Sequence, residues 1–302
     1  MTVERPVRKT HPWLHVLAWG LLLWAAATVT LALTEDLILL PSVVLIGSFL
    51  VPVATIFWFL EHRGTTELDE GRLFTAFFVA GVLGMICSAA MEIWLAPHRL
   101  LPNLWVGLIE EAAKGVGIYV LARGLRRYDV RDGILLGTVV GLGFGAFESA
   151  GYTLSYGLHN GEVSLHRLIS EELLREVIAP FCHGIWSGLL GAAIFSALGR
   201  GKRFSWGILL TYFAVVLLHA FWDSASNAAV VFTVIVSGDD SFGALSPKNL
   251  PFPADVTPQW LFGVFQWTLM IVIAVIGVWW LRRHWHDPAP ARAPEAAPGD
   301  NV

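Results

Sequence analysis

The chain has 302 residues, of which 55% are hydrophobic and 15% charged, with 14 tryptophans and a mean hydropathy of +0.62. This composition lies outside the usual range of soluble domains and is typical of polytopic membrane proteins. The formal net charge of -4 carries little information, because the distribution of Lys and Arg along a membrane protein matters more than their sum. Cys87 and Cys182 both lie in apolar runs, so we expect core packing rather than a disulfide.

Eight apolar segments are long enough to cross about 30 Å of hydrocarbon at about 1.5 Å per residue. They cover roughly residues 13–33, 37–60, 73–95, 104–122, 133–156, 177–198, 204–233 and 260–281. The predicted fold class is therefore all-α, a polytopic integral membrane helix bundle of about eight transmembrane helices. A basic stretch precedes the first segment, as in a signal peptide. Its apolar run of about 20 residues exceeds that of a signal sequence, so we expect a retained anchor.

The positive charges are distributed asymmetrically between the two sides of the predicted bundle. With the N-terminus in the cytoplasm, fifteen Lys and Arg residues fall on the inner side and four fall on the outer side. The outer four are Arg99, Arg167, Arg175 and Lys248. Positive residues concentrate on the cytoplasmic side of membrane proteins. We therefore predict a multi-pass protein of the cell membrane with both termini cytoplasmic.

Three segments outside the spans have recognisable patterns. Residues 157–176 alternate apolar and charged side chains, which is typical of an amphipathic helix on the outer membrane surface. Residues 237–258 contain four prolines and predict an irregular outer loop. The tail after Asp287 is rich in Ala and Pro and is expected to be disordered.

The fourth predicted span contains three ionisable residues, Glu110, Glu111 and Lys114. Each ionised group at the centre of a membrane helix costs roughly 2.5 to 3.5 kcal/mol on insertion scales. We therefore expect these three residues to form ion pairs or to belong to a functional site. Lys114 is four residues from Glu110 and three from Glu111, and therefore shares a helix face with both. An ion pair of Lys114 with one glutamate would leave the other glutamate without a cation of its own.

Three further spans carry ionisable groups at a similar predicted depth: Glu148, His183, and His219 with Asp223. Glu110 and His183 lie about 9 Å below the outer edge of the membrane, and Glu148 and His219 lie about 8 Å below it. Each residue alone has a structural interpretation, such as an interhelical hydrogen bond or an ion pair of Glu148 with Lys114. The shared depth predicts one site in the outer half of the membrane.

The side chains of this set can bind a metal ion and transfer protons. Two His, an Asp and Glu residues supply the nitrogen and oxygen ligands of zinc, together with a carboxylate that can act as a base. His219 and Asp223 are four residues apart and share a helix face. Glycines near Glu148 and His183 allow close approach of the helices that carry them. Glu92 at the outer end of the third span is interpreted as a solvated or structural carboxylate and is left out of the site.

The motifs also resemble those of a known family. They are E-E-x-x-K at Glu110, Glu111 and Lys114, F-x-x-x-E at Phe144 and Glu148, a lone histidine at His183, and H-x-x-x-D at His219 and Asp223. In this order on separate helices they resemble the PrsW family of intramembrane proteases, which is distantly similar to the CAAX-processing and bacteriocin-processing membrane proteases. The resemblance covers about residues 105–225.

The resemblance implies an intramembrane endopeptidase that cleaves a membrane-anchored protein near its extracytoplasmic face, and the family's best-known substrate is an anti-sigma factor. The expected domains are a cytoplasmic segment 1–12, a membrane protease domain 13–285 and a cytoplasmic tail 286–302. Expected partners are the substrate protein and the lipid bilayer, and no nucleic acid is expected.

The expected roles combine the resemblance with the chemistry of the side chains. Glu110 or Glu111 would be the general base, with His183 as a further catalytic residue and Lys114 and Phe144 in support. Metal ligands would come from His183, His219, Glu148 and Asp223, with zinc as the cofactor. Water activation by glutamate and histidine without a metal stays open as an alternative.

Two other functions compete with the protease. A proton- or cation-coupled transporter also carries carboxylates and histidines inside its bundle, but near the midplane and often in paired repeats. A non-catalytic membrane scaffold would tolerate replacement of the polar set by apolar residues. The off-centre depth and the lack of a visible repeat favour the protease.

The topology gives a first testable prediction. A reporter that is active only in the cytoplasm, fused to the C-terminus, should be active, because an even number of spans returns the chain to the side of its basic N-terminus. An inactive fusion that is nevertheless present in the membrane would contradict this orientation.

Overall fold

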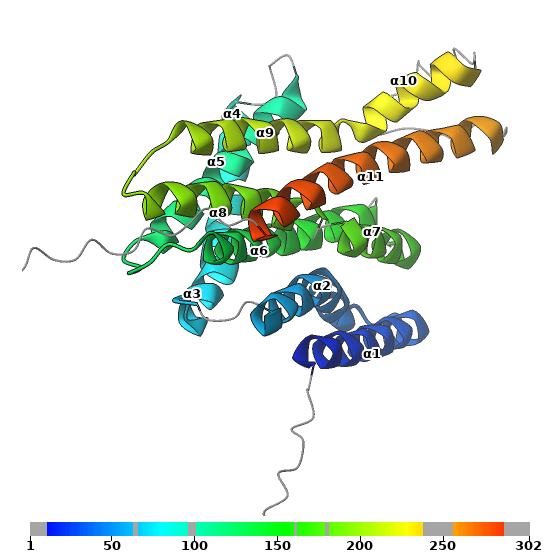
Figure 1. Ribbon diagram of the computed structural model, residues 1–302. Helices are drawn as coiled ribbons and strands as arrows, with labels where there is room; N and C mark the ends of the chain where they lie inside the picture. The colour runs from blue at the N-terminus through cyan, green and yellow to red at the C-terminus, as the bar shows by residue number, and fades with distance from the viewer. Residues whose placement is uncertain are drawn as a thin grey trace, which may run out of the picture.

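The computed structural model describes residues 11–62, 66–95, 101–159, 162–178, 181–237 and 256–286, nearly all of them helical (Figure 1). The elements in chain order are α1 (Pro12–Thr34), η1 (Leu37–Leu39), α2 (Leu40–His62), α3 (Glu70–Phe74), η2 (Thr75–Ala80), α4 (Gly81–Leu95), α5 (Pro102–Ala122), α6 (Val130–Gly157), β1 (Leu158–His159), β2 (Glu162–Val163), α7 (Leu165–Ile178), α8 (His183–Gly199), α9 (Trp206–Asp223), α10 (Ala225–Ser237) and α11 (Val256–His286). β1 and β2 form a two-residue antiparallel hairpin. Most of the predicted segment 1–12, the loop 237–258 and the tail 286–302 lies outside the described residues.

The prediction of an all-α polytopic bundle is confirmed. Among the described residues, seven segments are long and apolar enough to cross a membrane: Pro12–Thr34, Leu37–His62, Glu70–Leu95, Val130–Gly157, Leu165–Gly199, Trp206–Asp223 and Trp260–His286. Helix α5 has 21 residues and is not among these seven, because Glu110, Glu111 and Lys114 place three charged side chains close together in its middle. It is the eighth long helix of the bundle.

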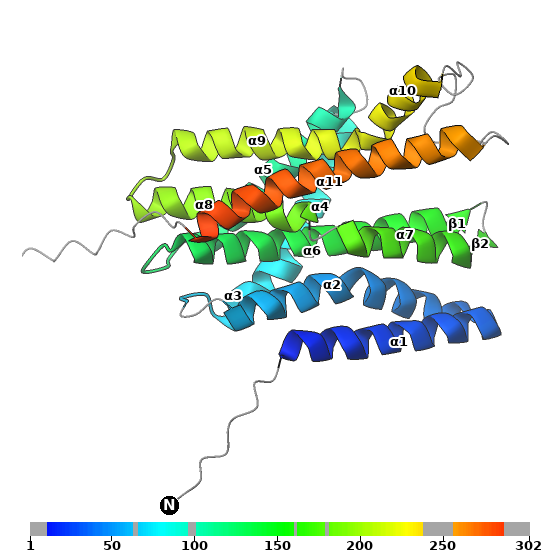
Figure 2. The same ribbon diagram turned by 45° about the vertical axis from the view of Figure 1, so that its right-hand side comes forward.

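Helix α6 occupies the centre of the bundle. In its most apolar window 89% of the residues are buried, compared with 11% in α1. Figure 2 shows α1 and α2 on one side of α6, and α9 and α11 on the other. The short α3, η2 and α4 run obliquely to these helices (Figure 2), and η2 and α4 pack against α5 and α6.

Glycines bring α6 and α8 into backbone contact. A Cβ atom added to Gly137 would lie 2.1 Å from the carbonyl oxygen of Ser187, and one added to Gly141 would lie 2.1 Å from that of His183. No side chain fits in these gaps, so the two helices approach as closely as their backbones allow. This approach sets the position of His183 relative to α6.

Helix α7 exists where an amphipathic helix is expected, but its predicted place on the membrane surface is wrong. It packs against α2 and α6 within the bundle, and Glu172 and Glu176 are buried there. Trp24 donates a hydrogen bond from its Nε1 atom to Glu172 at 2.9 Å, and the backbone N–H of Val51 donates one to Glu176 at 3.0 Å. These donors from α1 and α2 let carboxylates of α7 enter the bundle, because a buried carboxylate needs hydrogen-bond partners.

The predicted span 204–233 is also not one continuous helix. It divides at Ser224 into α9 and α10. The break falls at the polar pair Asp223-Ser224, and short polar side chains of this kind disfavour helix interiors. Asn103 of α5 donates a hydrogen bond to the Ser224 hydroxyl at 2.9 Å, which fixes the break beside α5.

The close approach of α6 and α8 gives a prediction about stability. Gly137→Ala should lower the free energy of unfolding by about 1–3 kcal/mol, the usual cost of inserting an extra methyl group into a packed core. Gly151→Ala in the same helix is the matched control, because a Cβ atom there would meet nothing within 4 Å. Thermal unfolding in detergent measures both variants. Equal unfolding midpoints would contradict the proposed packing.

Candidate active site

The structure brings all eight sequence-predicted site residues together, from four helices. Helix α5 supplies Glu110, Glu111 and Lys114, α6 supplies Phe144 and Glu148, α8 supplies His183, and α9 supplies His219 and Asp223. Every one of these side chains contacts at least one other in the set. The contacts fall into two groups, one around each histidine, which Lys114 connects.

Lys114 lies at the centre of the cluster with its side chain fully buried. Its Nζ atom is 3.0 Å from Glu110 Oε2, 2.9 Å from Glu111 Oε1 and 3.0 Å from His183 Nδ1. The ring of Phe144 lies below it, with the Nζ atom 4.0 Å from the ring centroid, as in a cation–π contact. The ammonium group therefore uses three donors and an aromatic face at once.

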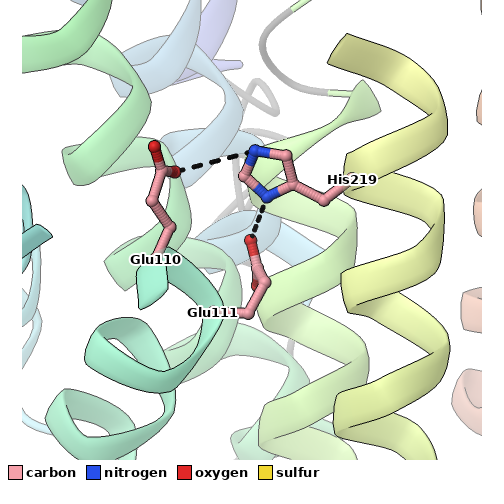
Figure 3. Close-up of side chains that lie close together, drawn as sticks. All are labelled: Glu110, Glu111 and His219. Carbon is pink, nitrogen blue, oxygen red and sulfur yellow. Dashed lines mark hydrogen bonds and ion pairs between the residues drawn. The ribbon is translucent and has the colours of Figure 1, made fainter. Parts of the chain in front are cut away.

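His219 faces both glutamates of α5 (Figure 3). Its Nδ1 atom lies 2.9 Å from Glu111 Oε1, and its Nε2 atom lies 3.8 Å from Glu110 Oε2 and 3.3 Å from Asp223 Oδ2. An ionised carboxylate only accepts hydrogen bonds, so Nδ1 carries a proton and donates it to Glu111. Glu111 therefore orients the ring and points Nε2 toward Glu110 and Asp223.

His183 is held between Lys114 and Glu148. The lysine ammonium has no acceptor, so His183 Nδ1 accepts the 3.0 Å hydrogen bond from it. The Nε2 atom then carries the ring proton and donates it to Glu148 Oε2 at 2.9 Å. The two imidazole rings lie 5.6 Å apart between centroids, so both histidines serve one site.

Arg175 of α7 belongs to the same cluster, although the sequence places it among the outer positive charges. Its Nη2 atom donates to Glu148 Oε2 at 2.8 Å, its Nε atom donates to Ser149 at 3.0 Å, and its guanidinium lies 4.3 Å from the Tyr152 ring centroid. No motif signals this residue. The signal that could have found it is the unbalanced charge of Glu148, which needs a cation from a neighbouring helix.

Trp186 is a second contributor that the sequence does not single out. It lies three residues after His183, is fully buried, and its ring is 5.9 Å from His183 and 5.0 Å from His219 between centroids. It packs behind both imidazoles and limits their rotation. This position explains why an aromatic residue follows His183 on the same face of α8.

A cavity of about 580 Å³ opens beside the cluster. Its walls include Glu92, Glu110, Glu148, Arg175, His183 and Asp223. Glu92 of α4 thus reaches the cavity, although the sequence assigns it no role. Glu111 does not line the cavity and is fully buried, so the two adjacent glutamates differ in their access to a substrate.

The charge and spacing of the donors fit a bound cation. Five carboxylates line the cavity and a sixth, that of Glu111, lies behind it beside Lys114, compared with the two cations Lys114 and Arg175 in this cluster. The carboxylates belong to Glu92, Glu110, Glu111, Glu148, Glu171 and Asp223. Ligand atoms of Glu110, Glu111 and His219 lie within 4.8 Å of one another. Two ligands of a tetrahedral zinc with bonds of about 2.1 Å lie about 3.4 Å apart, which the 3.3 Å between His219 Nε2 and Asp223 Oδ2 matches.

Comparisons with known proteins identify the family of this chain. Residues 71–238 match the family described as PrsW family intramembrane metalloproteases. Protease PrsW from Shouchella clausii (strain KSM-K16) is 24% identical over 188 residues, which are 59% of this chain and 81% of that protein. No solved structure matches the chain significantly. Because the match covers more than half of the chain and includes every helix of the polar cluster, the chain belongs to the PrsW family.

Proposed function

We propose that this protein is a zinc-dependent intramembrane endopeptidase that hydrolyses a peptide bond of a membrane-anchored protein near the extracytoplasmic face. The observation that carries the proposal is the placement of Glu110 and His219 Nε2, 3.8 Å apart, where Glu110 lines a polar cavity inside a bundle of membrane-length helices. A carboxylate and an imidazole nitrogen beside such a cavity can activate water for attack on a carbonyl group.

Glu110 is the better candidate for the general base than Glu111. Glu110 reaches the cavity, where a water molecule and a peptide can meet it. Glu111 is fully buried and has one oxygen committed to both Lys114 and His219. Its proposed role is to orient the imidazole of His219, as a carboxylate behind a catalytic or ligating histidine does.

The proposed hydrolysis proceeds by proton transfers within this cluster. Glu110 takes a proton from water, the water oxygen attacks the carbonyl carbon of the scissile bond, and the C–N bond then breaks as Glu110 returns the proton to the leaving amine. Lys114 stays protonated and holds Glu110 in position. Negative charge that develops on the carbonyl oxygen would be stabilised by a hydrogen-bond donor at the cavity wall. Arg175 is the candidate, because its guanidinium has N–H groups beyond those that bind Glu148 and Ser149.

His183, Glu148 and Arg175 form the second half of the site. Arg175 donates to Glu148 and Glu148 accepts from His183, so the ring of His183 is fixed with its Nε2 proton directed at Glu148. This chain of contacts gives Glu148 a positioning role in the absence of a metal. Glu148 and His183 could also bind a metal ion if bonds to the metal replaced their hydrogen bond to each other.

Zinc would be held by His219 Nε2 and Asp223. His183 and Glu148 are the further ligands expected from the sequence. The bound ion would polarise the carbonyl group of the substrate and lower the pKa of water. The donor set fits this ion because it combines imidazole nitrogen with carboxylate oxygen and carries excess negative charge. The residues of α5 would then act from outside the metal shell. Glu110 is the carboxylate that remains to accept a proton.

The extracytoplasmic position and a regulatory, anti-sigma-type substrate are part of the proposal. The positive-inside distribution supports an orientation of α5 with its N-terminal end outside. Glu110 is eight residues after Pro102, the first residue of α5, or about 12 Å along the helix. Cleavage at this depth would release the outer part of a single-span protein.

The base assignment gives a prediction about catalysis. Glu110→Gln preserves the shape of the side chain but removes its basicity, so cleavage should fall by about 10² to 10⁴. His183→Ala and His219→Ala should also abolish cleavage. The assay follows release of a tagged outer domain, with each member of a panel of tagged single-span membrane proteins co-expressed in turn with each variant at equal membrane levels.

Glu172→Gln is the matched control, because Glu172 is a buried carboxylate that does not line the cavity. It should cleave at the wild-type rate. Wild-type cleavage by Glu110→Gln would remove Glu110 as the base. A wild type that cleaves no panel member yet carries a proton or cation flux in liposomes would favour the transporter instead.

The metal assignment gives a separate prediction. Purified wild-type protein should contain stoichiometric zinc, and His219→Ala and Asp223→Ala should lose it, because each removes a ligand. Glu110→Gln should keep its zinc although it is inactive, since a base is not a ligand. Elemental analysis of the four proteins measures this. Full activity after removal of all metal would show that glutamate and histidine activate water directly.

A further inference from the structure

A second hollow lies beside the cavity, between α11 and the region where α7 ends and α8 begins. It has a volume of about 710 Å³, and its walls are almost wholly apolar. We call it the α11 groove, and it is defined by Ile178, Phe181, Trp222, Met270, Val275 and Trp279 with their neighbours. Ile271, Val275 and Trp279 are between 57% and 60% exposed, so the groove is open on the side of the lipid.

The α11 groove is continuous with the cavity. Ile178 of α7, Trp222 of α9 and Met270 of α11 line both hollows. Trp222 precedes Asp223 in the chain, and its ring packs 5.9 Å from Trp186, which lies behind both histidines. The boundary between lipid-facing groove and polar cavity thus consists of three side chains, one from each of three helices.

The α11 groove is long enough to hold the central and inner part of a membrane-spanning helix. Along α11 its walls extend from Trp267 to His286, or about 28 Å at 1.5 Å per residue. The hydrocarbon core of a bilayer is about 30 Å thick. The inner end carries Arg282, Arg283 and His286, which suits the level of the cytoplasmic headgroups. Met270 lies near the opposite end, so the groove meets the cavity toward the outer side.

We propose that the α11 groove docks the transmembrane helix of the substrate and presents its outer end to the cavity across Ile178, Trp222 and Met270. The proposal rests on the proposed function, and it names the surface that selects a membrane-anchored substrate. Apolar side chains of the substrate helix would pack against α11 in place of lipid, as in other contacts between membrane helices. Helix α11 lies outside the part of the chain that matches the family.

Site-specific photo-crosslinking tests the groove independently of cleavage. A photoreactive phenylalanine analogue replaces Ile271 or Val275 in the groove, or Val272 or Ile276, which are exposed to a similar degree on the same helix but do not line it. Each variant is co-expressed with the panel of tagged single-span proteins described above. We expect tagged adducts from the two groove positions and at most a few percent of that yield from the two controls.

Bulky substitutions at the same positions supply the functional test. Val275→Trp should lower cleavage of a panel member by about tenfold or more, because the larger side chain would fill the groove and exclude the substrate helix. Binding energy from such remote parts of a substrate supports catalysis. Ile276→Trp should cleave at the wild-type rate. Equal yields of adducts at all four positions, or adducts with lipid alone, would contradict docking of the substrate helix in the α11 groove. Adducts from the two groove variants, together with a wild type that cleaves no panel member, would instead refute the proposed protease and leave the docking site supported.

Discussion

The ion cluster of Lys114 with Glu110 and Glu111 is the interaction on which the site depends. Breaking a buried ion pair by removing one partner costs about 3–5 kcal/mol, because an uncompensated charge stays behind. One ammonium here serves two carboxylates at 3.0 and 2.9 Å, so the cluster retains one negative charge. That excess is the physical reason for the nearby imidazole of His219, and it supports the proposed binding of a zinc ion.

The cluster can form because α6 has glycines where α8 crosses it. With Gly141 touching the backbone of His183, the imidazole comes within 2.9 Å of Glu148 and 3.0 Å of Lys114. An ordinary side chain at that position would separate the helices and stretch both contacts beyond hydrogen-bond length. Backbone packing that looks structural is therefore a condition for the chemistry of the site.

The sequence predicted the fold class and the membership of the polar cluster, because motifs at i, i+3 and i+4 spacing and matched depths are local properties of membrane helices. It did not predict the packing of α7 into the bundle or the role of Arg175. Both depend on partners far away in the chain, namely Trp24, Val51 and Glu148. The break at Ser224 was missed because hydropathy averages over two polar residues, whereas Asn103 of α5 engages one of them directly.

Under the proposed function, the cavity and the α11 groove would have different tasks in proteolysis. A helix in lipid keeps its backbone hydrogen bonds because hydrocarbon offers no substitute, and each unsatisfied group costs several kcal/mol. A peptide bond can therefore become accessible only where polar side chains replace those bonds. The cavity supplies such groups in Arg175, Tyr152 and the surrounding carboxylates, while the apolar α11 groove does not. A substrate helix would stay helical along α11 and unwind only at the outer end, which restricts the cut to the level of Glu110.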